Sequence, residues 1–446
     1  MNTSTTASQS KPPSPSLPAT QEAPIQPPTP EQAAAIDAIA AWAASPTSGT
    51  FFVLKAPAGC GKTFCVKHLV SRIKGRMVFT APTNKATKVL RQSLTSDRYK
   101  PDCRTIYSLL GLSLSADGEV KELKQPEEPI DLSEYRLVVV DEGSMLNSVV
   151  MGHLRNTAES FALKVLFLGD PAQLPPVKEA FSPIWGIPDV VTLSKVMRHD
   201  NQILAFATQL RHLVSCPAGM PMIASSNTNG EGIWSEPAHA FHHRIALAAD
   251  LGQFSSPDLA KVIAWRNVTV DTFNTLIRRR IFPDSWHTSQ YHVGDRVLFT
   301  APASDLEDKP LAKIDDEGTV MRVSVSWHPS HPEFKVFELA ITLDDGKPIL
   351  ARSLHPDSER AYTTKLTDLA AAARDDRRKW RHYWDFKETF HQLRYAYAIT
   401  AHRSQGSTYE TAFVNYRDIL VNRDRAEALR CLYVAATRPR KQLILG

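Results

Sequence analysis

One stretch near the start of the chain restricts the fold more than any other: an apolar run that ends in a glycine-rich turn and leads into a helical pattern. Residues 51–56 (Phe-Phe-Val-Leu-Lys-Ala) are typical of a buried strand, and residues 63–74 fit a helix. A turn in this position directs backbone N–H groups towards phosphate oxygens, while a lysine adds charge and a threonine hydroxyl can ligate Mg²⁺. The sequence therefore predicts a phosphate-binding loop made of Pro57, Ala58, Gly59, Cys60, Gly61, Lys62 and Thr63.

Further short apolar runs alternate with helical patterns over the first part of the chain. Residues 77–81, 137–140 and 164–168 are expected strands, and residues 29–44 and 85–96 are expected helices. Thr29-Pro30 is typical of a helix start, with a capping hydroxyl and proline at the first helical position. The alternation predicts a parallel α/β sheet whose strands end at the edge that carries the phosphate loop.

Polar residues follow two of these strands at the same edge. The run 138–140 ends in Asp141-Glu142, and the run 166–168 ends in Gly169-Asp170-Pro171-Ala172-Gln173. We expect Asp141 to hold a magnesium ion and Glu142 to orient and deprotonate an attacking water. Gln173 is an uncharged donor and acceptor that can sense a γ-phosphate. These residues, with Lys62 and Thr63, predict a site that hydrolyses ATP with Mg²⁺.

The rest of the chain divides by its composition. Residues 1–28 are rich in Pro, Ser and Thr and are expected to form a disordered tail. A second α/β unit is expected from about residue 190 to 280. Short β-runs separated by turn residues predict a small antiparallel barrel at 290–355, and residues 364–394 fit helices. Strand-like runs at 395–399, 411–414 and 442–445 close the chain.

Composition excludes several classes of protein. The 446 residues carry 52 Lys+Arg and 47 Asp+Glu, and this net charge of +5 permits a nucleic-acid partner without requiring one. The 5 cysteines form no CxxC pair and no Cys/His cluster, which argues against a disulfide scaffold and a zinc site. No stretch approaches the ~18 apolar residues of a membrane span, and no secretory signal is evident. We expect an intracellular, cytoplasmic protein without a membrane partner.

Strings spread over nearly the whole folded chain resemble the motifs of superfamily 1 helicases. The phosphate loop, the Asp-Glu pair and Gly-Asp-Pro-x-Gln are three of these, and residues 80–86 (Thr-Ala-Pro-Thr-Asn-Lys-Ala) are similar to motif Ia. Residues 105–111 resemble the Thr-Ile-His-Ser-Leu-Leu string of the 5′→3′ subclass, with Tyr107 in place of histidine. Residues 193–198, 400–408 and 432–438 look like motifs IV, V and VI. The length and motif spacing are most similar to Dda-like helicases, and more distantly to RecD-like ones.

The resemblance implies an α/β fold of two RecA-like P-loop NTPase domains, with a small hairpin inserted in the first and an SH3-like β-barrel in the second. The implied domains are 29–189 (1A, with a strand-splitting pin at about 111–129), 190–289 with 395–446 (2A), and 290–394 (2B, barrel 290–355 and helical tower 364–394). ATP would bind between 1A and 2A, with Gln32 reading adenine and Gly406 near the nucleotide. Arg198 and Arg438 would point at the γ-phosphate.

The resemblance also implies an ATP-dependent DNA helicase that moves 5′→3′ on single-stranded DNA and separates a fork duplex. Small hydroxyls and amides suit phosphate and sugar contacts that do not read sequence. The expected DNA contacts are Pro82, Thr83, Asn84, Thr105, Tyr107, His402, Ser404 and Gln405. The expected pin contains no aromatic residue, which leaves Leu112 or Leu114 as an apolar wedge.

Several alternatives stay open from the sequence. A translocase that displaces bound proteins with weak unwinding fits a pin without an aromatic, and an RNA helicase fits because no motif reads a 2′-OH. A non-motor, nucleotide-regulated binding module would require a damaged hydrolytic set, whereas the set is complete. Basic and aromatic residues at 374–394 suit strand binding, but their helical spacing favours an arm packed on its neighbour. Replication or single-strand-binding proteins are candidate partners, and two RecA-like domains in one chain favour a monomer.

Overall fold

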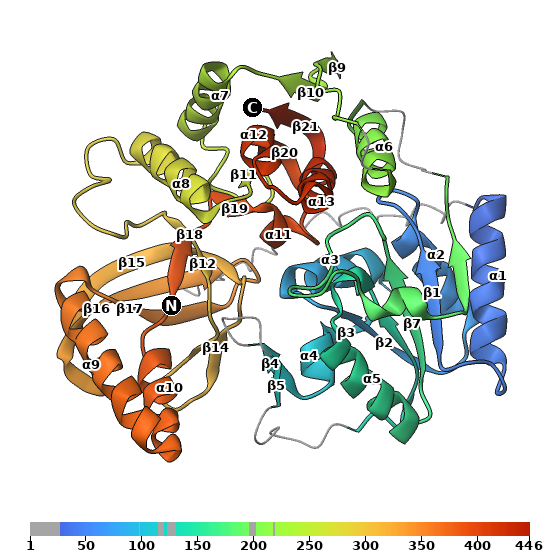
Figure 1. The fold of residues 1–446 in the computed structure, drawn as a ribbon, viewed down its shortest axis with the longest axis horizontal. Coiled ribbons are helices and arrows are strands. Elements are labelled where there is room, and N and C mark those ends of the chain that lie inside the picture. Colours follow the sequence, from blue (N-terminus) through green and yellow to red (C-terminus); the bar gives the residue numbers. More distant parts are fainter. Residues whose placement is uncertain (1–26, 98, 115–119, 123–130, 196–201, 217–218) are drawn as a thin grey trace, which may run out of the picture.

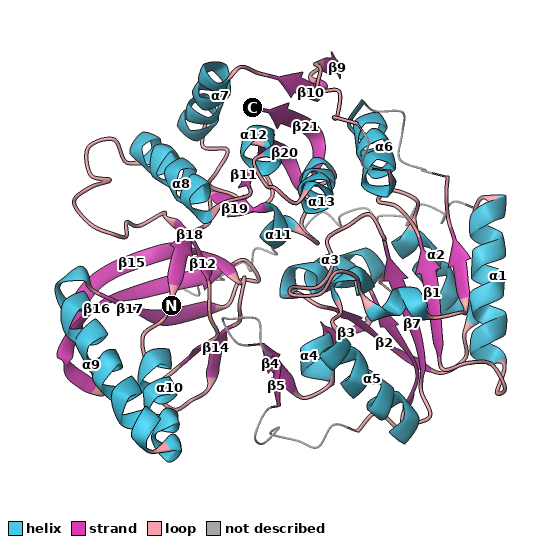
Figure 2. Ribbon diagram, viewed as in Figure 1, coloured by secondary structure: helices cyan, strands magenta, loops and turns pink. Residues whose placement is uncertain are grey.

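The computed structural model describes residues 27–97, 99–114, 120–122, 131–195, 202–216 and 219–446. These residues form a mixed α/β molecule around two mainly parallel sheets and one antiparallel sheet, with helices packed on the parallel sheets (Figure 1; Figure 2). We call the parts around these sheets the first, second and inserted units. In Figure 1 the first unit lies on the right, the second at the top and the inserted unit on the left. The expected tail, 1–28, lies almost wholly outside the described residues.

Six parallel strands form the sheet of the first unit, in the order β3-β2-β6-β7-β1-β8. Their bounds are β1 Phe51–Lys55, β2 Arg76–Ala81, β3 Asp102–Thr105, β6 Tyr135–Val140, β7 Lys164–Gly169 and β8 Val190–Thr192. The helices are α1 Pro30–Ala44, α2 Lys62–Arg72, α3 Asn84–Leu94, α4 Ile106–Leu109 and α5 Ser148–Ser160. Apolar side chains are buried on both faces of the sheet, as in a parallel sheet covered by helices. The predicted strands and helices of this unit are confirmed to within a residue or two at each end.

The expected boundary at residue 190 is wrong, because β8 belongs to the first sheet. Val190–Thr192 pairs in parallel with Val53–Lys55 of β1. Beyond β8, the carboxylate of Glu31 on α1 accepts a hydrogen bond from the backbone N–H of Ser194 at 2.7 Å. The first unit therefore extends at least to Ser194. An apolar run in the sequence shows that a strand is present, but not which sheet it joins.

The sheet of the second unit has the order β19-β11-β20-β21-β10-β9, and all its pairs are parallel except that between β9 and β10. Its strands are β9 Ser226–Thr228, β10 Glu231–Ser235, β11 Ala260–Ala264, β19 Ala398–Thr400, β20 Tyr409–Val414 and β21 Pro439–Leu445. Its helices are α6 Gln202–Ser215, α7 Ala238–Asp250, α8 Asn267–Ile281, α11 Ala401–Ser404, α12 Tyr416–Leu420 and α13 Arg425–Ala436. The chain leaves this unit after α8 and returns at β19, which pairs with β11.

The inserted unit is a five-stranded antiparallel sheet in the order β17-β16-β15-β12-β18. Its strands are β12 Arg296–Phe299, β15 Glu317–His328, β16 His331–Leu343, β17 Pro348–Leu354 and β18 Leu393–Tyr395, beside a separate pair of β13 Ala303–Ser304 and β14 Pro310–Ala312. The antiparallel region is confirmed, but the expected single strand at 395–399 is wrong. Tyr395 ends a strand of the inserted sheet, whereas Ala398 begins a strand of the second unit, because one apolar run passes between two sheets.

Two helices, α9 Pro356–Asp375 and α10 Trp380–Glu388, cover one end of the inserted sheet. The helical segment begins before the predicted residue 364, because His355 caps it and Pro356 occupies its first position. Phe386 and Phe390 are buried against Phe334 of β16, which supports the packed-arm interpretation of this segment. Short 3₁₀ turns lie at Gly143–Met145, Pro183–Gly186 and Arg377–Lys379. None of the helices in the described part of the chain is long and apolar enough to span a membrane.

The predicted hairpin after α4 is present where the structure describes it. β4 Leu112–Leu114 and β5 Val120–Glu122 pair antiparallel. The turn between them and residues 123–130 lie outside the described residues. Leu112 is buried, so it is not exposed to act as the apolar wedge that the sequence suggested.

Candidate functional site

The predicted phosphate loop connects the end of β1 to the start of α2, at the carboxyl edge of the first sheet. Gly59 and Gly61 have φ angles of 84° and 86°, a left-handed conformation that favours glycine. A Cβ on Gly61 would lie 2.5 Å from Nε2 of Gln32, so a side chain there would displace the Gln32 amide from its place at the loop. Gly61 begins α2 without a side-chain cap, and the N–H groups of the first turn are therefore suited to bind an anion.

Two neighbouring side chains of helix α1 contact this loop and the segment after β8. Gln32 forms a reciprocal capping box with Thr29, and its Nε2 donates to the carbonyl oxygen of Cys60 at 3.1 Å. The predicted adenine-reading amide therefore lies at the loop but is bonded to protein. Glu31, which the sequence analysis did not single out, accepts hydrogen bonds from the hydroxyl and backbone N–H of Ser194, and these bonds lower its pKa. Glu31 thus fixes the chain after β8 against the nucleotide side of the molecule.

Three charged groups lie beside the loop. Lys62 Nζ donates to the carbonyl oxygens of Ala56 and Pro57 at 2.9 and 3.3 Å. Asp141 and Glu142 follow β6, and the backbone N–H of Glu142 donates to Oδ1 of Asp141 at 2.8 Å. Burial raises the pKa of both carboxyls, the charge of Asp141 further raises that of Glu142, and Lys62 opposes both shifts.

The donor set beside the loop fits a magnesium-bound nucleotide. Glu142 Oε2 is shielded from solvent and has no hydrogen-bond partner among the described residues, which is unusual for a buried carboxylate oxygen. The Thr63 hydroxyl on the first turn of α2 and the Asp141 carboxylate offer the oxygen ligands that Mg²⁺ prefers. The structure thus groups Thr63, Asp141 and Glu142 at one edge of the sheet.

The residues after β7 join this edge to the second unit. The hydroxyl of Tyr433 on α13 donates to Oδ2 of Asp170 at 2.5 Å, and the backbone N–H of Ala58 donates to the same oxygen at 3.2 Å. Nε2 of Gln405, which follows α11, donates to Oε1 of Gln173 at 3.0 Å. Asp170 and Gln173 are both buried. Gln173 therefore lies between the two units, as a residue that senses the nucleotide for both would require.

Three residues of this interface were missed as functional candidates: Asp170, Tyr433 and Arg430. Arg430 on α13 donates through Nη1 to the carbonyl oxygen of Gln173 at 2.8 Å. Asp170 and Tyr433 stand inside strings that the sequence analysis quoted, so their position in those strings was the available signal. Arg430 lies before the motif VI string and carried no signal of its own.

Of the two arginines predicted to point at the γ-phosphate, the structure describes Arg438. Arg198 lies outside the described residues. Arg438 is buried, and its guanidinium donates to the carbonyl oxygens of Val434 and Ser407 and to the hydroxyl of Thr437. Its charge still lowers the pKa of Glu142 across the cleft, opposing the larger effect of burial. In this structure Arg438 therefore lies near the carboxylate pair but is held by its own unit.

Gly406, which was expected near the nucleotide, packs on α3 of the first unit. Its φ of 75° favours glycine, and a Cβ there would meet the Cβ of Ala86 on α3 at 2.9 Å. The nearest side-chain atoms also include the Thr83 hydroxyl at 3.6 Å. Gly406 therefore allows the loop after α11 to pack on the start of α3.

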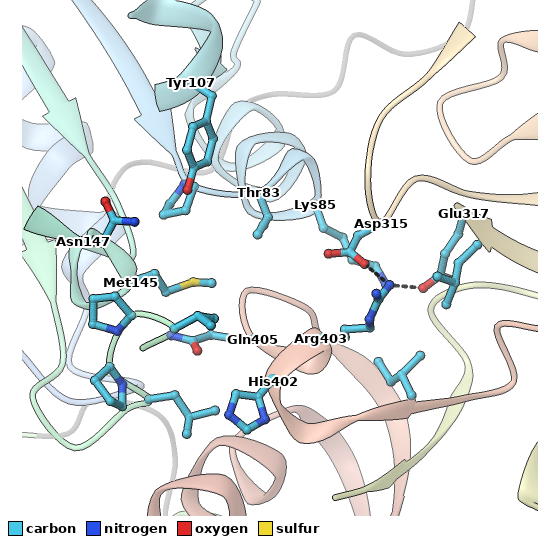
Figure 3. Close-up of a pocket in the computed structure, with 17 residues that line it drawn as sticks. Thr83, Lys85, Tyr107, Met145, Asn147, Asp315, Glu317, His402, Arg403 and Gln405 are labelled. Carbon is cyan, nitrogen blue, oxygen red and sulfur yellow. Dashed lines mark hydrogen bonds and ion pairs between the residues drawn. The ribbon is translucent and has the colours of Figure 1, made fainter. Parts of the chain in front are cut away.

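A cavity of about 230 Å³ lies between the three units, and Figure 3 shows the side chains that line it. Five of the predicted DNA contacts line this cavity: Pro82, Thr83, Tyr107, His402 and Gln405. Tyr107 and His402 project into the space from opposite sides (Figure 3). Burial lowers the pKa of His402, and Glu427, 3.5 Å away, opposes this shift. Residues that the sequence analysis did not select also line the cavity: Met145, Asn147, Pro175, Pro176 and Val177.

The other three predicted DNA contacts do not line the cavity. Thr105 is buried, and its hydroxyl oxygen accepts the backbone N–H of Ser108 as the cap of α4. Ser404 is fully buried, and its hydroxyl donates to the carbonyl oxygen of Ala401. Asn84 donates to Oδ1 of Asp316 in the inserted unit at 3.2 Å. In this structure Thr105 and Ser404 stabilise local turns, which corrects the expectation that they contact DNA directly.

Two cations of the cavity wall are paired with acids of the inserted unit. Lys85 Nζ lies 2.7 Å from Oε1 of Glu317, and Arg403 Nη1 lies 2.5 Å from Oδ1 of Asp315 (Figure 3). None of these four residues was selected from the sequence. Asp315 and Glu317 stand in a segment whose acids and glycine are typical of a turn, so local sequence offered no sign of a role between units.

Comparisons with known proteins agree with this arrangement. Residues 28–213 match the family described as an AAA domain, and residues 395–445 match the UvrD-like helicase C-terminal domain. The chain is 25% identical to the ATP-dependent DNA helicase dda of Enterobacteria phage T4 over 428 residues, which cover 87% of this chain and 92% of that protein. It is 24% identical to the uncharacterized protein R530 of Acanthamoeba polyphaga mimivirus, over 88% of this chain and 94% of that protein.

Solved structures share the fold over nearly the whole chain. A Pif1 helicase from Bacteroides in complex with ADP-AlF3 and ssDNA superposes with a TM-score of 0.50 at 16% identity, covering 93% of this chain and 92% of that one. A structure of two coordinating Pif1 helicases at forked dsDNA also gives 0.50, at 17% identity, over 94% and 92% of the chains. The first family match covers the first unit and extends into α6, the second covers the C-terminal part of the second unit, and the two structures extend over nearly the whole chain.

Proposed function

We propose that this chain, a superfamily 1 helicase of the Dda and Pif1 type, is an ATP-driven motor that moves 5′→3′ along single-stranded DNA and separates duplex strands. The hydrogen bond between Gln173 and Gln405 carries the proposal. Gln173 follows the strand β7 beside the phosphate loop, whereas Gln405 lines the cavity between the units. One direct contact therefore joins the nucleotide side of the molecule to the strand side.

The nucleotide chemistry assigned to the chain follows from its own groups. The N–H groups of the loop and Lys62 bind the phosphates, and Thr63 and Asp141 are suited to hold Mg²⁺. The metal ion, when bound, neutralises charge on the phosphate oxygens. Glu142 orients the attacking water and accepts its proton, which its raised pKa favours. Arg438, with Arg198, is proposed to stabilise the charge that develops on the γ-phosphate once the units close.

The strand is proposed to pass through the cavity between the units. The Tyr107 ring offers a stacking surface that tolerates any base, and the Thr83 hydroxyl and the His402 ring suit phosphate and sugar contacts. These contacts do not read sequence, as a motor that travels along DNA requires. The 5′→3′ polarity rests on the resemblance of residues 105–111 to a motif of the 5′→3′ subclass, and the preference for DNA on the likeness to the DNA helicase dda and to Pif1 helicase structures with ssDNA and forked dsDNA.

The units described above suggest a revised division of the chain into domains. We assign residues 29–195 with the hairpin to a first RecA-like domain, and residues 202–289 with 396–446 to a second. The inserted domain then comprises residues 290–395, with β18 as the last strand of its sheet. The sheet to which each strand belongs supports this division, which differs from the sequence-based one only at β8 and β18.

The test is ATP hydrolysis with and without single-stranded DNA or RNA, followed by strand displacement on DNA duplexes with a 5′ or a 3′ tail. We expect stimulation by single-stranded DNA and displacement of the 5′-tailed duplex alone. Lys62→Ala should abolish both activities, while Lys67→Ala, an exposed lysine on the same helix, should leave them intact. Hydrolysis without displacement would favour the protein-displacing translocase, and stronger stimulation by RNA would favour the RNA helicase.

A further inference from the structure

Residues Asp315, Asp316 and Glu317, here called the acidic turn, lead into β15 of the inserted unit and contact both other units. Asp316 accepts a hydrogen bond from Asn84 Nδ2 at the start of α3, and Glu317 pairs with Lys85 on the same helix. Asp315 pairs with Arg403 on α11. Three consecutive acids therefore hold the beginnings of the two helices that supply cavity residues from opposite sides.

Glu317 is the centre of a buried charge cluster. Its Oε1 lies 2.7 Å from Lys85, and its Oε2 lies 3.0 Å from Lys261 of β11 and 3.3 Å from Arg296 of β12. The ring of Tyr409 lies beside both ammonium groups, 5.5 Å from Lys85 Nζ and 5.6 Å from Lys261 Nζ. The first, second and inserted units each contribute a cation to this one carboxylate.

The charges of this cluster show which contact can be released. Arg296 also pairs with Asp344, so three cations face two carboxylates. Without Lys85, cations and carboxylates would be equal in number, and Glu317 would keep its bonds to Lys261 and Arg296. Burial lowers the pKa of Lys261 to about 8, and the neighbouring Lys85 and Arg296 add to this shift against the attraction of Glu317. Although burial opposes it, the attraction of Glu317 and Tyr409 holds the pKa of Lys85 above its ordinary value, so Lys85 is charged while it is docked. Lys85 is the member of this cluster that the first unit supplies, so its contact with Glu317 is the one that breaks when that unit moves away.

The remaining contacts of α3 extend the same interface. Lys88, one turn after Asn84, donates through Nζ to the carbonyl oxygen of Asp344 at 2.7 Å. One face of α3 is thus docked on two turns of the inserted sheet. The preceding residue, Thr83, caps α3 through its hydroxyl and lines the cavity. A shift of the inserted unit would therefore move a residue of the cavity wall.

We propose that the acidic turn is a reversible latch, in which the Lys85–Glu317 and Arg403–Asp315 ion pairs dock the strand-facing ends of α3 and α11 on the inserted unit. Lys85 leaves when the two parallel-sheet units separate, whereas Lys261 and Arg296 stay with Glu317. The latch positions the inserted unit relative to the strand in each cycle, and so couples ATP hydrolysis to strand separation. This role rests on the motor function proposed above.

A competing account is that Lys85 and Arg403 serve to bind strand phosphates, with the acids as their partners in the free protein. The two accounts predict opposite signs for acid variants. If the acids only mask the cations, Asp315→Asn frees Arg403 and strengthens strand binding, while Lys85→Met weakens it. If the acidic turn is a latch, removal of either partner has the same effect. Lys85→Met is the safer variant for folding, because Glu317 keeps two cations.

The first test measures docking and does not depend on activity. Fluorescent dyes are placed at Gln92→Cys on α3 and Lys347→Cys in the turn after β16, both exposed positions, in a Cys216→Ser background. We expect Lys85→Met and Asp315→Asn each to lower energy transfer between the dyes. Glu307→Gln, an exposed acid of the inserted unit outside the acidic turn, is the matched control and should not. Unchanged transfer in both variants would overturn the proposal.

The second test measures coupling as strand displacement per ATP hydrolysed, beside the Kd for oligo(dT). We expect Lys85→Met and Asp315→Asn each to lower this ratio by about 5-fold or more, the usual lower range for coupled sites. The Kd should move in the same direction in both variants, and Lys85→Arg should restore the ratio. Tighter binding by Asp315→Asn with weaker binding by Lys85→Met would overturn the latch. If the unaltered chain neither hydrolyses ATP nor binds DNA, the motor function fails, while the transfer measurement still decides whether the latch exists.

Discussion

The first unit meets the rest of the molecule at two places that are built in different ways. On the nucleotide side, the contacts are separate hydrogen bonds without an ion pair among those described: Tyr433 donates to Asp170, Gln405 to Gln173, and Arg430 to the carbonyl oxygen of Gln173. At the acidic turn, the contacts are ion pairs in a largely buried cluster around Glu317. Both places lie at the borders of the same cavity, which Gln405 and Glu317 line together.

The difference suggests a division of roles. A hydrogen bond contributes about 0.5–1.5 kcal/mol net, or about 1.5–3 kcal/mol to a charged group, so the nucleotide-side contacts can form and break with each nucleotide. A buried charge that loses its partner costs far more, which makes the acidic turn sensitive to the whole position of α3. Lys85 is the member of that cluster that belongs to the first unit, so its contact with Glu317 follows the movement of α3. The nucleotide side is thus suited to respond to ATP, and the acidic turn to transmit the response.

Glu142→Gln should give the largest effect and tests the chemistry on the nucleotide side alone. The amide keeps the shape of the side chain but cannot accept a proton, so we expect kcat for ATP hydrolysis to fall by about 10²–10⁴-fold. Binding of a fluorescent nucleotide should persist. Glu159→Gln, an exposed acid on α5, is the control. A Glu142→Gln variant that hydrolyses ATP at the normal rate would remove Glu142 from the mechanism.

Tyr107→Ala should give the next largest effect, now on the strand side. Loss of one stacking surface costs about 1–3 kcal/mol per base, so we expect the Kd for oligo(dT) to rise by about 5- to 150-fold. Fluorescence anisotropy of a labelled oligonucleotide measures this. Tyr107→Phe should bind almost normally, because the ring is retained. Equal weakening by both variants would mean that the hydroxyl, and not the ring, makes the contact.

These two predictions concern residues that the sequence could supply, because each belongs to a contiguous string. The phosphate loop and the Asp141-Glu142 pair follow strands in the sequence, and parallel strands bring their carboxyl ends to one edge. The strands β1, β2, β6 and β7 of the first sheet were predicted for the same reason, whereas β3 was not predicted and β8 was placed in the second unit. Local sequence also explains why Tyr107 could be selected: it lies in a string whose neighbours repeat a known motif.

The acidic turn could not be found in this way. Asp315, Asp316 and Glu317 are acids near a glycine, and such a segment usually predicts an exposed turn. Their partners Lys85, Lys261 and Arg296 are far away in the sequence and lie in three units. A buried ion pair depends on which units meet, and the sequence of one segment does not contain that information. Thr105 and Ser404 failed in the opposite way: their strings were identified, but their hydroxyls face the backbone.

Tyr433→Phe should give a moderate effect and tests whether the nucleotide-side contact helps the units close. The variant removes the hydrogen bond to the Asp170 carboxylate and leaves the ring in place. Hydrogen bonds to charged groups contribute about 1.5–3 kcal/mol, so we expect kcat/KM for ATP to fall by about 10-fold or more. Tyr416→Phe, on α12 of the same unit, is the control. A normal kcat/KM would show that closure depends on other contacts, with the acidic turn as the first candidate.

The last prediction concerns the charge cluster, where we expect the smallest effect on activity. The quantity measured is the free energy of unfolding as a function of pH. Burial lowers the pKa of Lys261 to about 8 from 10.5, with Lys85 and Arg296 adding to the shift. Between these values the unfolded chain keeps a proton that the folded chain has released, so the contribution of Lys261 to stability rises with pH over that window.

Lys261→Met lacks this proton, and urea unfolding of both proteins from pH 8 to 10.5 isolates its effect from the titration of tyrosines and cysteines. The stability of the unaltered chain relative to Lys261→Met should increase with pH. This increase should be smaller in a Lys85→Met background, because removal of Lys85 raises the pKa of Lys261 towards its ordinary value. A difference that does not change with pH would mean that Lys261 keeps an ordinary pKa, and that Lys85 docks without opposition from like charge.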